Sequence, residues 1–391
     1  MDPIKNPFTP GAGYPPHELV GREAVLEEAR ILLGRTLRKK PEKSMLLTGL
    51  RGVGKTVLLN AIEQEAQSQG YKTIFFEVTE SQTMGHKLIP ALRNLFFELD
   101  RIEGSKEMIK RGLMILRNFI GSLKLNYGEF GVELDPLPGI ADSGNPEIDL
   151  PDLFLAVAEA ARAKNSGVAL LIDEIQLLRQ EELAGLIMAM HKLQQKQAPF
   201  VLIAAGLPTL PRLAGEAKSY AERLFSYPII GQLTKEECDS ALQEPVSLEH
   251  ADFSQDALDA IYQHTRGFPY FLQEWGYQVW KVATHPYMTR DDVQAAETLV
   301  TARLDTNFFR VRYDRLTDGE KRFLHAMATG ATPCKSADVA EKLNMKPSAA
   351  TPIRASLIRK GMIFSPRHGF IDYSVPLFGE FLNRTEKNTC Q

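Results

Sequence analysis

A glycine-rich segment near the start of the chain carries residue types that bind phosphate groups. The segment 49–56 reads Gly-Leu-Arg-Gly-Val-Gly-Lys-Thr, and it lies between a short apolar run at 45–47 and a helical pattern that begins at residue 57. Glycines allow backbone angles at which successive N–H groups turn toward phosphate oxygens, and the following helix adds the partial positive charge of its amino end. The residues expected around the phosphates are Gly49, Arg51, Gly52, Val53, Gly54, Lys55, Thr56 and Val57.

Two of these side chains have a defined task in a loop of this kind. The Lys55 ammonium is expected to reach the β- and γ-phosphates of ATP, and the Thr56 hydroxyl is expected to hold Mg²⁺. A glycine-rich turn between a strand and a helix, with no ligand, is the structural alternative. A second site elsewhere in the chain decides between the two interpretations.

An acidic pair supplies that second site. The apolar run 167–172 shows no alternation, which is typical of a strand buried on both faces of a parallel sheet, and it ends at Asp173 and Glu174. A carboxylate at Asp173 can bind Mg²⁺ through water, and Glu174 is placed to take a proton from the attacking water. Acids at a strand end are alone a weak indication of an ATPase site. They become a strong one when a phosphate-binding loop (P-loop) such as 49–56 precedes them in the chain. The sequence therefore predicts ATP hydrolysis, with Lys55 and Glu174 as catalytic residues.

The elements that would position these residues alternate between strands and helices. Strands are predicted at 45–47, 72–78, 167–174, 200–205 and 226–230, and helices at 24–33, 57–62, 87–119, 153–163 and 181–195. This order is typical of a doubly wound α/β fold with a parallel sheet, whose ligand lies at the carboxyl ends of the strands. An alternating stretch at 123–134 predicts a β-hairpin insertion, followed by a loop at 136–151.

The last third of the chain is helical and then changes character. Thr234, Ser254 and Thr289 are predicted helix caps, and the last of these helices runs to about residue 315. Helices at 318–328, 337–343 and 348–360 precede two short strands, 362–365 and 370–375, which together make a winged helix-turn-helix. The predicted domains are an extended arm at 1–20, a nucleotide-binding core at 21–232 with the hairpin insertion around 120–150, a helical lid with a linker helix at 233–315, and the winged helix at 316–386.

Composition gives no overall attraction to nucleic acid or membranes. The net charge is −3 and the pI is near 6.3, so any such contact needs a local patch of charge. We find no apolar stretch of membrane-spanning length and no signal core in the first residues, which predicts a cytoplasmic protein. Cys238, Cys334 and Cys390 show no metal-ligand spacing and are expected to be free thiols.

Further cations could act on a nucleotide or on nucleic acid. Arg223, just before the last core strand, could reach the γ-phosphate of a neighbouring subunit, or it could be a surface arginine paired with Glu222 or Glu216. The winged-helix residues that could contact DNA phosphates are Arg354, Arg359, Lys360 and Arg367. Acids dilute this patch, so a winged helix that docks a protein or inhibits the core is the alternative.

The motifs and their order resemble those of AAA+ ATPases related to origin-recognition proteins and archaeal-type ATPases, and they also resemble the STAND class of signalling NTPases. The likeness covers nearly the whole chain and is carried by Leu19–Glu23, the P-loop, Leu170–Glu174, Glu222–Phe225, Gly267–Pro269 and the winged helix. The resemblance implies a nucleotide held between the core and the lid. It also implies that Val20 and Gly21 line the adenine pocket and that Pro269 touches the base.

Two departures from these families bear on the expected function. Pro269 and Tyr270 stand where the origin-recognition type carries an arginine sensor, which fits the STAND arrangement better. The strand ending at 204–208 lacks the polar sensor typical of AAA+ proteins, and Thr209 is the nearest candidate. We expect an ATP-dependent switch whose winged helix binds double-stranded DNA, as a monomer or a homo-oligomer. The alternative is a signalling ATPase whose winged helix docks a protein partner.

Overall fold

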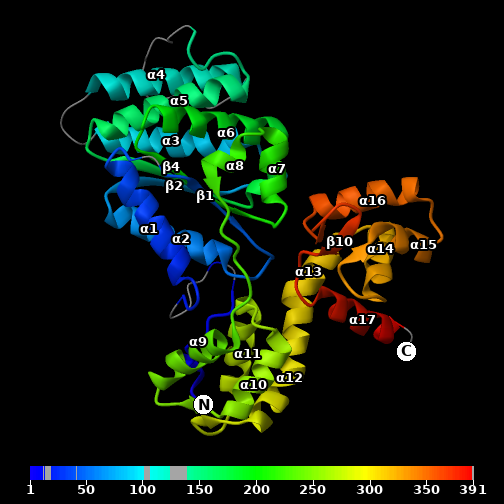
Figure 1. The fold of residues 1–391 in the computed structure, drawn as a ribbon. Coiled ribbons are helices and arrows are strands. Elements are labelled where there is room, and N and C mark those ends of the chain that lie inside the picture. The colour runs from blue at the N-terminus through cyan, green and yellow to red at the C-terminus, as the bar shows by residue number, and fades with distance from the viewer. Residues whose placement is uncertain (12, 14–18, 41, 101–105, 124–138, 390–391) are drawn as a thin grey trace.

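The apolar runs predicted as core strands assemble into one parallel sheet. The computed structural model describes residues 1–11, 13, 19–40, 42–100, 106–123 and 139–389. The strands lie in the order β2-β3-β4-β1-β5, with all pairs parallel (Figure 1). Their bounds are β1 Ser44–Thr48, β2 Tyr71–Glu77, β3 Gly167–Asp173, β4 Phe200–Gly206 and β5 Phe225–Ser226. Since β3 and β4 are buried along their whole length, their sequences show no polar alternation.

Helices cover both faces of the sheet, which confirms the predicted doubly wound α/β fold. On one face lie α1 (Glu23–Leu37) and α2 (Lys55–Ser68), and on the other lie α3 (Met84–Asp100), α5 (Pro146–Arg162) and α6 (Gln180–Gln195) (Figure 1). Neighbouring strand residues point to opposite faces, so Leu46 of β1 packs with the second group and Leu47 with the first. The short helices α7 (Leu210–Ala217) and α8 (Ala221–Leu224) lead to β5.

Three of the predicted segments differ in the structure. The last core strand, expected at 226–230, is shortened to β5, and Ile229 forms only an isolated bridge with Thr48. The helical run expected at 87–119 is divided into α3 and α4 (Lys106–Ser122), which pack so closely that a Cβ on Gly112 would lie 2.3 Å from the Phe96 ring. The loop expected at 136–151 is wrong in its second half, because α5 begins at Pro146. The Asn145 side chain caps this helix, and Pro146 occupies the first turn, where no N–H is needed. The hairpin predicted at 123–134 falls, after its first residue, within residues 124–138, which lie outside the described ranges.

The helices predicted after residue 233 are present and form a separate group, which we call the lid. The lid consists of α9 (Lys235–Ser247), α10 (Gln255–Thr265), α11 (Pro269–Val282) and α12 (Arg290–Leu304). At the start of α9 the Thr234 side chain accepts from the Glu237 N–H, and the Glu237 carboxylate accepts from the Thr234 N–H, as the capping-box pattern predicts. A parallel pair of two-residue strands, β6 (Asp252–Phe253) and β7 (Tyr287–Met288), was not predicted.

Figure 1 shows how the last part of the chain returns to the core. The helical line of α12 continues through the π-helix η3 (Asp305–Arg310) and α13 (Val311–Tyr313) from the lid toward the core. We call residues 316–389 the C-terminal part. It contains α14 (Asp318–Ala328), α15 (Ser336–Lys342), α16 (Pro347–Arg359) and α17 (Phe378–Thr389), together with an antiparallel sheet of order β8-β10-β9, formed by β8 (Cys334–Lys335), β9 (Ile363–Phe364) and β10 (Phe370–Tyr373). Only β8 and α17 were not predicted.

The amino-terminal arm, expected to have no core of its own, is anchored on the lid. It contains one turn of 3₁₀ helix, η1 (Pro3–Lys5). Phe8 is 2% exposed and lies directly on Gly276 of α11, where an added Cβ would come within 2.6 Å of the Phe8 ring. The Trp280 indole N–H donates to the Asp2 carbonyl at 2.8 Å. At the other end of the arm, the Asn60 amide of α2 donates to the Gly13 carbonyl.

A buried ion pair holds two helices of the C-terminal part together. Glu320 of α14 is 4% exposed and accepts hydrogen bonds from the Lys360 ammonium and the Ser356 hydroxyl, both at 2.7 Å. Burial alone would raise the pKa of this carboxyl, but the bonds from Lys360 and Ser356 outweigh it and lower the pKa from 4.5 to about 2.

This pair predicts an acid-sensitive contribution to stability. Because the folded-state pKa of Glu320 lies below that of an unfolded chain, its stabilisation is complete above about pH 5 and is lost as the pH falls toward 2. We expect Glu320→Gln to lower the thermal unfolding temperature near neutral pH, and the deficit to shrink with acidification. The control is Glu27→Gln, which breaks an exposed pair with Arg30 and should have little effect at any pH. A Glu320→Gln deficit that stays constant down to pH 2 would contradict the assignment.

Candidate nucleotide-binding and catalytic site

The loop between β1 and α2 has a shape that only glycine permits. Gly52 and Gly54 have φ of +79° and +89°, in the left-handed region. A Cβ on Gly49 would lie 2.3 Å from the Ile230 carbonyl oxygen. No side chain caps the amino end of α2, so its first N–H groups are available to an anion. The loop therefore has the glycine-dependent backbone and the uncapped helix start that the predicted phosphate cradle requires.

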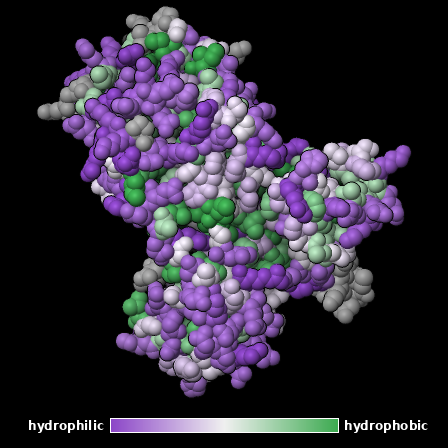
Figure 2. All heavy atoms as spheres, in the orientation of Figure 1, coloured by the Kyte–Doolittle hydropathy of each residue, from purple (hydrophilic) through white to green (hydrophobic). Residues whose placement is uncertain are grey.

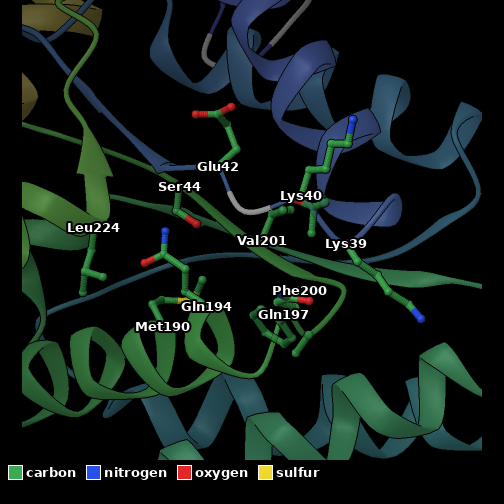
Figure 3. A pocket seen from close by; sticks show the side chains of 12 residues that line it. Lys39, Lys40, Glu42, Ser44, Met190, Gln194, Gln197, Phe200, Val201 and Leu224 are labelled. Atoms are coloured by element: carbon green, nitrogen blue, oxygen red, sulfur yellow. The ribbon is translucent and has the colours of Figure 1, made fainter.

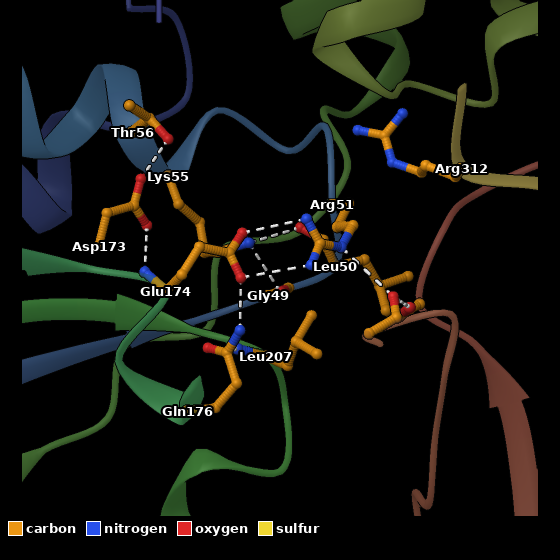
Figure 4. Close-up of polar contacts among 12 residues, drawn as sticks. Gly49, Leu50, Arg51, Lys55, Thr56, Asp173, Glu174, Gln176, Leu207 and Arg312 are labelled. Atoms are coloured by element: carbon orange, nitrogen blue, oxygen red, sulfur yellow. Dashed lines mark hydrogen bonds and ion pairs between the residues drawn. The ribbon is translucent and has the colours of Figure 1, made fainter. Parts of the chain in front are cut away.

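The structure brings Lys55, Thr56 and Asp173 together at this cradle (Figure 4). Lys55 is 7% exposed, and its ammonium donates to the carbonyls of Gly49 and Leu50 at 3.0 and 2.8 Å. Burial lowers the pKa of Lys55 to about 8. The Thr56 hydroxyl donates to the Asp173 carboxylate, whose pKa is raised by burial. A hydroxyl and a carboxylate oxygen side by side are hard oxygen donors, and such a pair fits Mg²⁺.

Glu174 lies beside this group but is engaged by other residues. Its backbone is left-handed, with φ of +52°, which is an uncommon and strained conformation for a residue with a side chain. The Arg51 guanidinium meets both carboxylate oxygens, at 3.2 and 3.4 Å, and the Gln176 amide donates to one of them (Figure 4). Arg51, expected only as part of the phosphate cradle, thus forms an ion pair with the predicted catalytic acid.

Two other parts of the chain contact the same loop. The Tyr270 N–H, at the start of α11 in the lid, donates to the Gly52 carbonyl at 3.2 Å. The Arg51 N–H donates to the Ser374 carbonyl at 3.0 Å, and the Arg51 Nε donates to the Gly361 carbonyl at 3.3 Å. The P-loop is therefore bonded to the lid and to the C-terminal part at once. Figure 2 shows hydrophobic residues gathered in the middle of the molecule, where these parts meet.

The residues expected around the adenine lie at the junction of core and lid. Gly21 has a left-handed backbone and lies against the Glu237 carboxylate of α9. Val20, half-buried, comes directly before it. Pro269 occupies the first turn of α11, and the Gly267 carbonyl accepts from the Leu233 N–H at 2.8 Å. Both Gly21 and Pro269 therefore flank the segment that joins the core to α9.

Arg223 lies far from this group. It is exposed on α8, and the next strand pairs Phe225 with Ser44 at the amino end of β1. Arg223 therefore lies at the amino-terminal end of the strands, whereas the P-loop lies at their carboxyl end. It cannot reach the phosphates bound by its own chain. A cavity of about 30 Å³, lined in part by Ser44, Phe200 and Leu224, lies at that same amino-terminal end (Figure 3). It has room for about one water molecule and does not extend to the P-loop.

The four predicted DNA-contacting residues have different surroundings. Arg359 and Arg367 are exposed, and Arg367 lies over the Phe370 ring at 3.8 Å. Arg354 is half-buried, and its Nε is buried with no hydrogen-bond partner among the described residues. Lys360 is occupied by its bond to Glu320. The exposed positive charge of this surface is therefore smaller than the sequence suggests.

One cation near the site was missed. Arg312, on α13, faces the P-loop beside Arg51 (Figure 4). Its guanidinium lies over the Phe308 ring at 4.4 Å and donates to the Phe308 carbonyl. Burial, and to a smaller extent the nearby charge of Arg51, lowers the pKa of Arg312 to about 10. No motif or spacing in the sequence distinguishes Arg312 from the other arginines of this helical segment.

Comparison with known families gives the class of the core. Residues 18–203 match the AAA ATPase domain. Residues 306–382 match a domain of unknown function, DUF8462. No curated protein matches the sequence. Residues 18–203 thus form an AAA+ P-loop domain that binds nucleotide, and the protein is an ATPase.

Solved structures share the fold at low sequence identity. The Walker-type ATPase of Pyrococcus abyssi is 14% identical with a TM-score of 0.59, and the match covers 93% of this chain and 96% of that one. Cdc6p from Pyrobaculum aerophilum is 16% identical (TM-score 0.47, covering 100% and 99%). The Aeropyrum pernix Orc1 protein in complex with DNA is 14% identical (TM-score 0.45, covering 96% and 95%). The first of these shows a common fold. Among the described residues, no helix is both long and apolar enough to cross a membrane.

The buried ammonium of Lys55 predicts a large loss of nucleotide affinity on its removal. Lys55→Ala deletes a charged donor at the phosphate cradle, which costs roughly 10- to 100-fold in affinity. Fluorescent ATP-analogue binding to full-length protein measures this loss. The control is Lys72→Ala, which removes a partly exposed lysine paired with Glu98 and should leave affinity unchanged. Equal affinity of the two variants would remove Lys55 from the site.

Proposed function

We propose that this ATPase is a molecular switch, in which bound Mg-ATP sets the position of a C-terminal winged helix that binds duplex DNA. The observation that carries the proposal is the simultaneous contact of the P-loop with the lid, through Tyr270, and with the C-terminal part, through Ser374 and Gly361. A ligand shifts an equilibrium between two states only if it binds them with different affinity. Phosphates in the cradle would compete with these contacts, which supplies the difference.

In this proposal each residue at the cradle has a separate role in hydrolysis. The Lys55 ammonium would leave the Gly49 and Leu50 carbonyls for the phosphates and stabilise the charge that develops there. Thr56 and Asp173 would hold Mg²⁺, which supplies charge neutralisation at the phosphates. The Glu174 carboxylate would take the proton of the attacking water. For that role one of its oxygens must become free of Arg51 and Gln176.

This assignment predicts a separation of binding from turnover. Glu174→Gln keeps the size of the side chain but removes its basicity, so we expect unchanged ATP affinity and a loss of turnover of about 10²- to 10⁴-fold. Phosphate release and analogue binding are measured on the same preparation. Glu77→Gln is the control, because Glu77 ends the neighbouring strand opposite Asp173 and has no assigned role. If Glu77→Gln and Glu174→Gln lose turnover equally, the base is not specifically Glu174.

The C-terminal part supports DNA binding as a winged helix. Its helices α14 to α16 and the strands β9 and β10 follow in the order of that fold. The exposed arginines that could meet phosphates are Arg359, the last residue of α16, and Arg367, in the turn between β9 and β10. Protein docking is the second candidate function, and it is favoured by the contact that this part already makes with the P-loop. Arg223, exposed at the amino-terminal end of the strands, could act only on a neighbouring subunit.

The salt dependence of duplex binding separates the two functions. Arg359→Glu combined with Arg367→Glu should weaken binding and make the log–log salt dependence shallower by about 2, because each lost phosphate contact removes about 0.9. The control is Arg38→Glu combined with Lys40→Glu, an equal change of charge at exposed core residues. If both pairs behave alike, or no duplex binds at low salt, the protein-docking function is the better explanation.

A further inference from the structure

We propose that Arg51 is a positioning residue that links the C-terminal part to Glu174. When the C-terminal part is seated on the P-loop, Arg51 holds the Glu174 carboxylate and suppresses hydrolysis; when the C-terminal part lifts, both side chains are released. The inference rests on the proposed role of Glu174 in ATP turnover. It assigns the regulation of that site to one side chain.

Arg51 makes contacts in two directions. Toward the core, its two terminal nitrogens meet the two oxygens of Glu174, with the side chains 22% and 15% exposed. Toward the C-terminal part, its Nε and its backbone N–H donate to two carbonyls, those of Gly361 and Ser374. A guanidinium is a planar fork, so fixing its Nε restricts where its terminal nitrogens point. The seat on Gly361 thus sets the position of the fork that grips Glu174.

The seat, formed by Gly361 and Ser374, is buried and internally hydrogen-bonded, and it fits the guanidinium closely. Gly361 and Ser374 are both buried. They are bonded to each other, because the Ser374 hydroxyl donates to the Gly361 carbonyl. The Ser374 N–H also donates to the Met362 carbonyl at 3.0 Å. A Cβ on Gly361 would lie 2.6 Å from an Arg51 terminal nitrogen, so the present position of Arg51 requires glycine there.

The grip on Glu174 opposes its role as a base. A base must bring an oxygen within hydrogen-bond reach of the water it deprotonates. Both oxygens of Glu174 are instead held by Arg51, and one also accepts from Gln176. Bound phosphates would offer Arg51 a second anionic partner within the loop to which it belongs. This competition gives the nucleotide a direct route to loosening the contact.

Two glycines of the C-terminal part allow a matched test. Gly361 and Gly369 both have positive φ, +61° and +78°, so alanine imposes backbone strain at each. Only at residue 361 does the added methyl press on Arg51, whereas nothing lies within 4 Å of a Cβ at residue 369. Gly361→Ala should therefore displace the guanidinium, and Gly369→Ala serves as the control.

The experiment compares steady-state ATP turnover of the full-length variants. We expect Gly361→Ala to raise kcat about three- to tenfold over wild type, with kcat of Gly369→Ala unchanged. Arg51→Ala should raise kcat similarly even if its KM rises, and Gly361→Ala should add nothing in that background, because both changes break the same contact. Equal kcat for the two glycine variants, or a Gly361→Ala effect that persists without Arg51, overturns the proposal.

The outcomes also separate this proposal from the ATPase mechanism on which it rests. If turnover depends on Glu174 but is the same in Gly361→Ala and Gly369→Ala, only the link through Arg51 fails. If Glu174→Gln has no effect on turnover, Glu174 is not the base, and the mechanism on which the proposal rests is wrong. Thermal unfolding checks that both glycine variants fold. Should Gly361→Ala not fold, Arg51→Ala decides alone, since an unchanged or lower kcat would overturn the proposal.

Discussion

The backbone of one short loop limits what the rest of the molecule can do. Gly52 and Gly54 hold left-handed angles, and Gly49 lies against the Ile230 carbonyl. The first turn of α2 therefore points its N–H groups outward from the end of β1. Three other parts of the structure contact this loop or the helix that follows it. β3 places Asp173 beside Thr56, the Tyr270 N–H of α11 donates to the Gly52 carbonyl, and the C-terminal part is bonded to the preceding residue, Arg51.

This arrangement places two uses of the same loop in competition. The carbonyls of Gly49 and Leu50 hold the Lys55 ammonium, and the fork of Arg51 holds Glu174. These contacts keep charged groups satisfied within the protein, which is what buried charges require. A nucleotide would replace them with phosphate contacts. In the switch proposed above, the affinity of the site for ATP and the attachment of the C-terminal part are therefore coupled.

The sequence was most informative where a residue type has a single physical use. Apolar runs without alternation located β3 and β4, and the spacing of Gly54, Lys55 and Thr56 located the loop between β1 and α2. Capping pairs such as Thr234 with Glu237 located helix starts to within a residue. These signals are local, because each depends on the backbone within about one turn of the residue concerned.

Contacts between distant segments could not be predicted in the same way. The bond from Arg51 to Gly361 joins residues 310 positions apart, and Arg312 reaches the P-loop only because α12 continues through a π-helix. A loop was predicted to extend to residue 151, but α5 begins earlier, at the cap provided by Asn145. Lys360 was predicted to contact DNA because the sequence does not show that its side chain pairs with Glu320, which lies on another helix. In each case the deciding neighbour is supplied by tertiary packing.

The amino-terminal arm limits how far the lid can travel. Phe8 is packed on α11, and the Gly13 carbonyl accepts a bond from Asn60 on α2, so a stretch of five residues connects a lid anchor to a core anchor. Fully extended, such a stretch spans at most about 18 Å. The arm therefore tethers the lid to α2 of the core. While both anchors hold, the lid can rotate about its junction with the core but cannot separate from it.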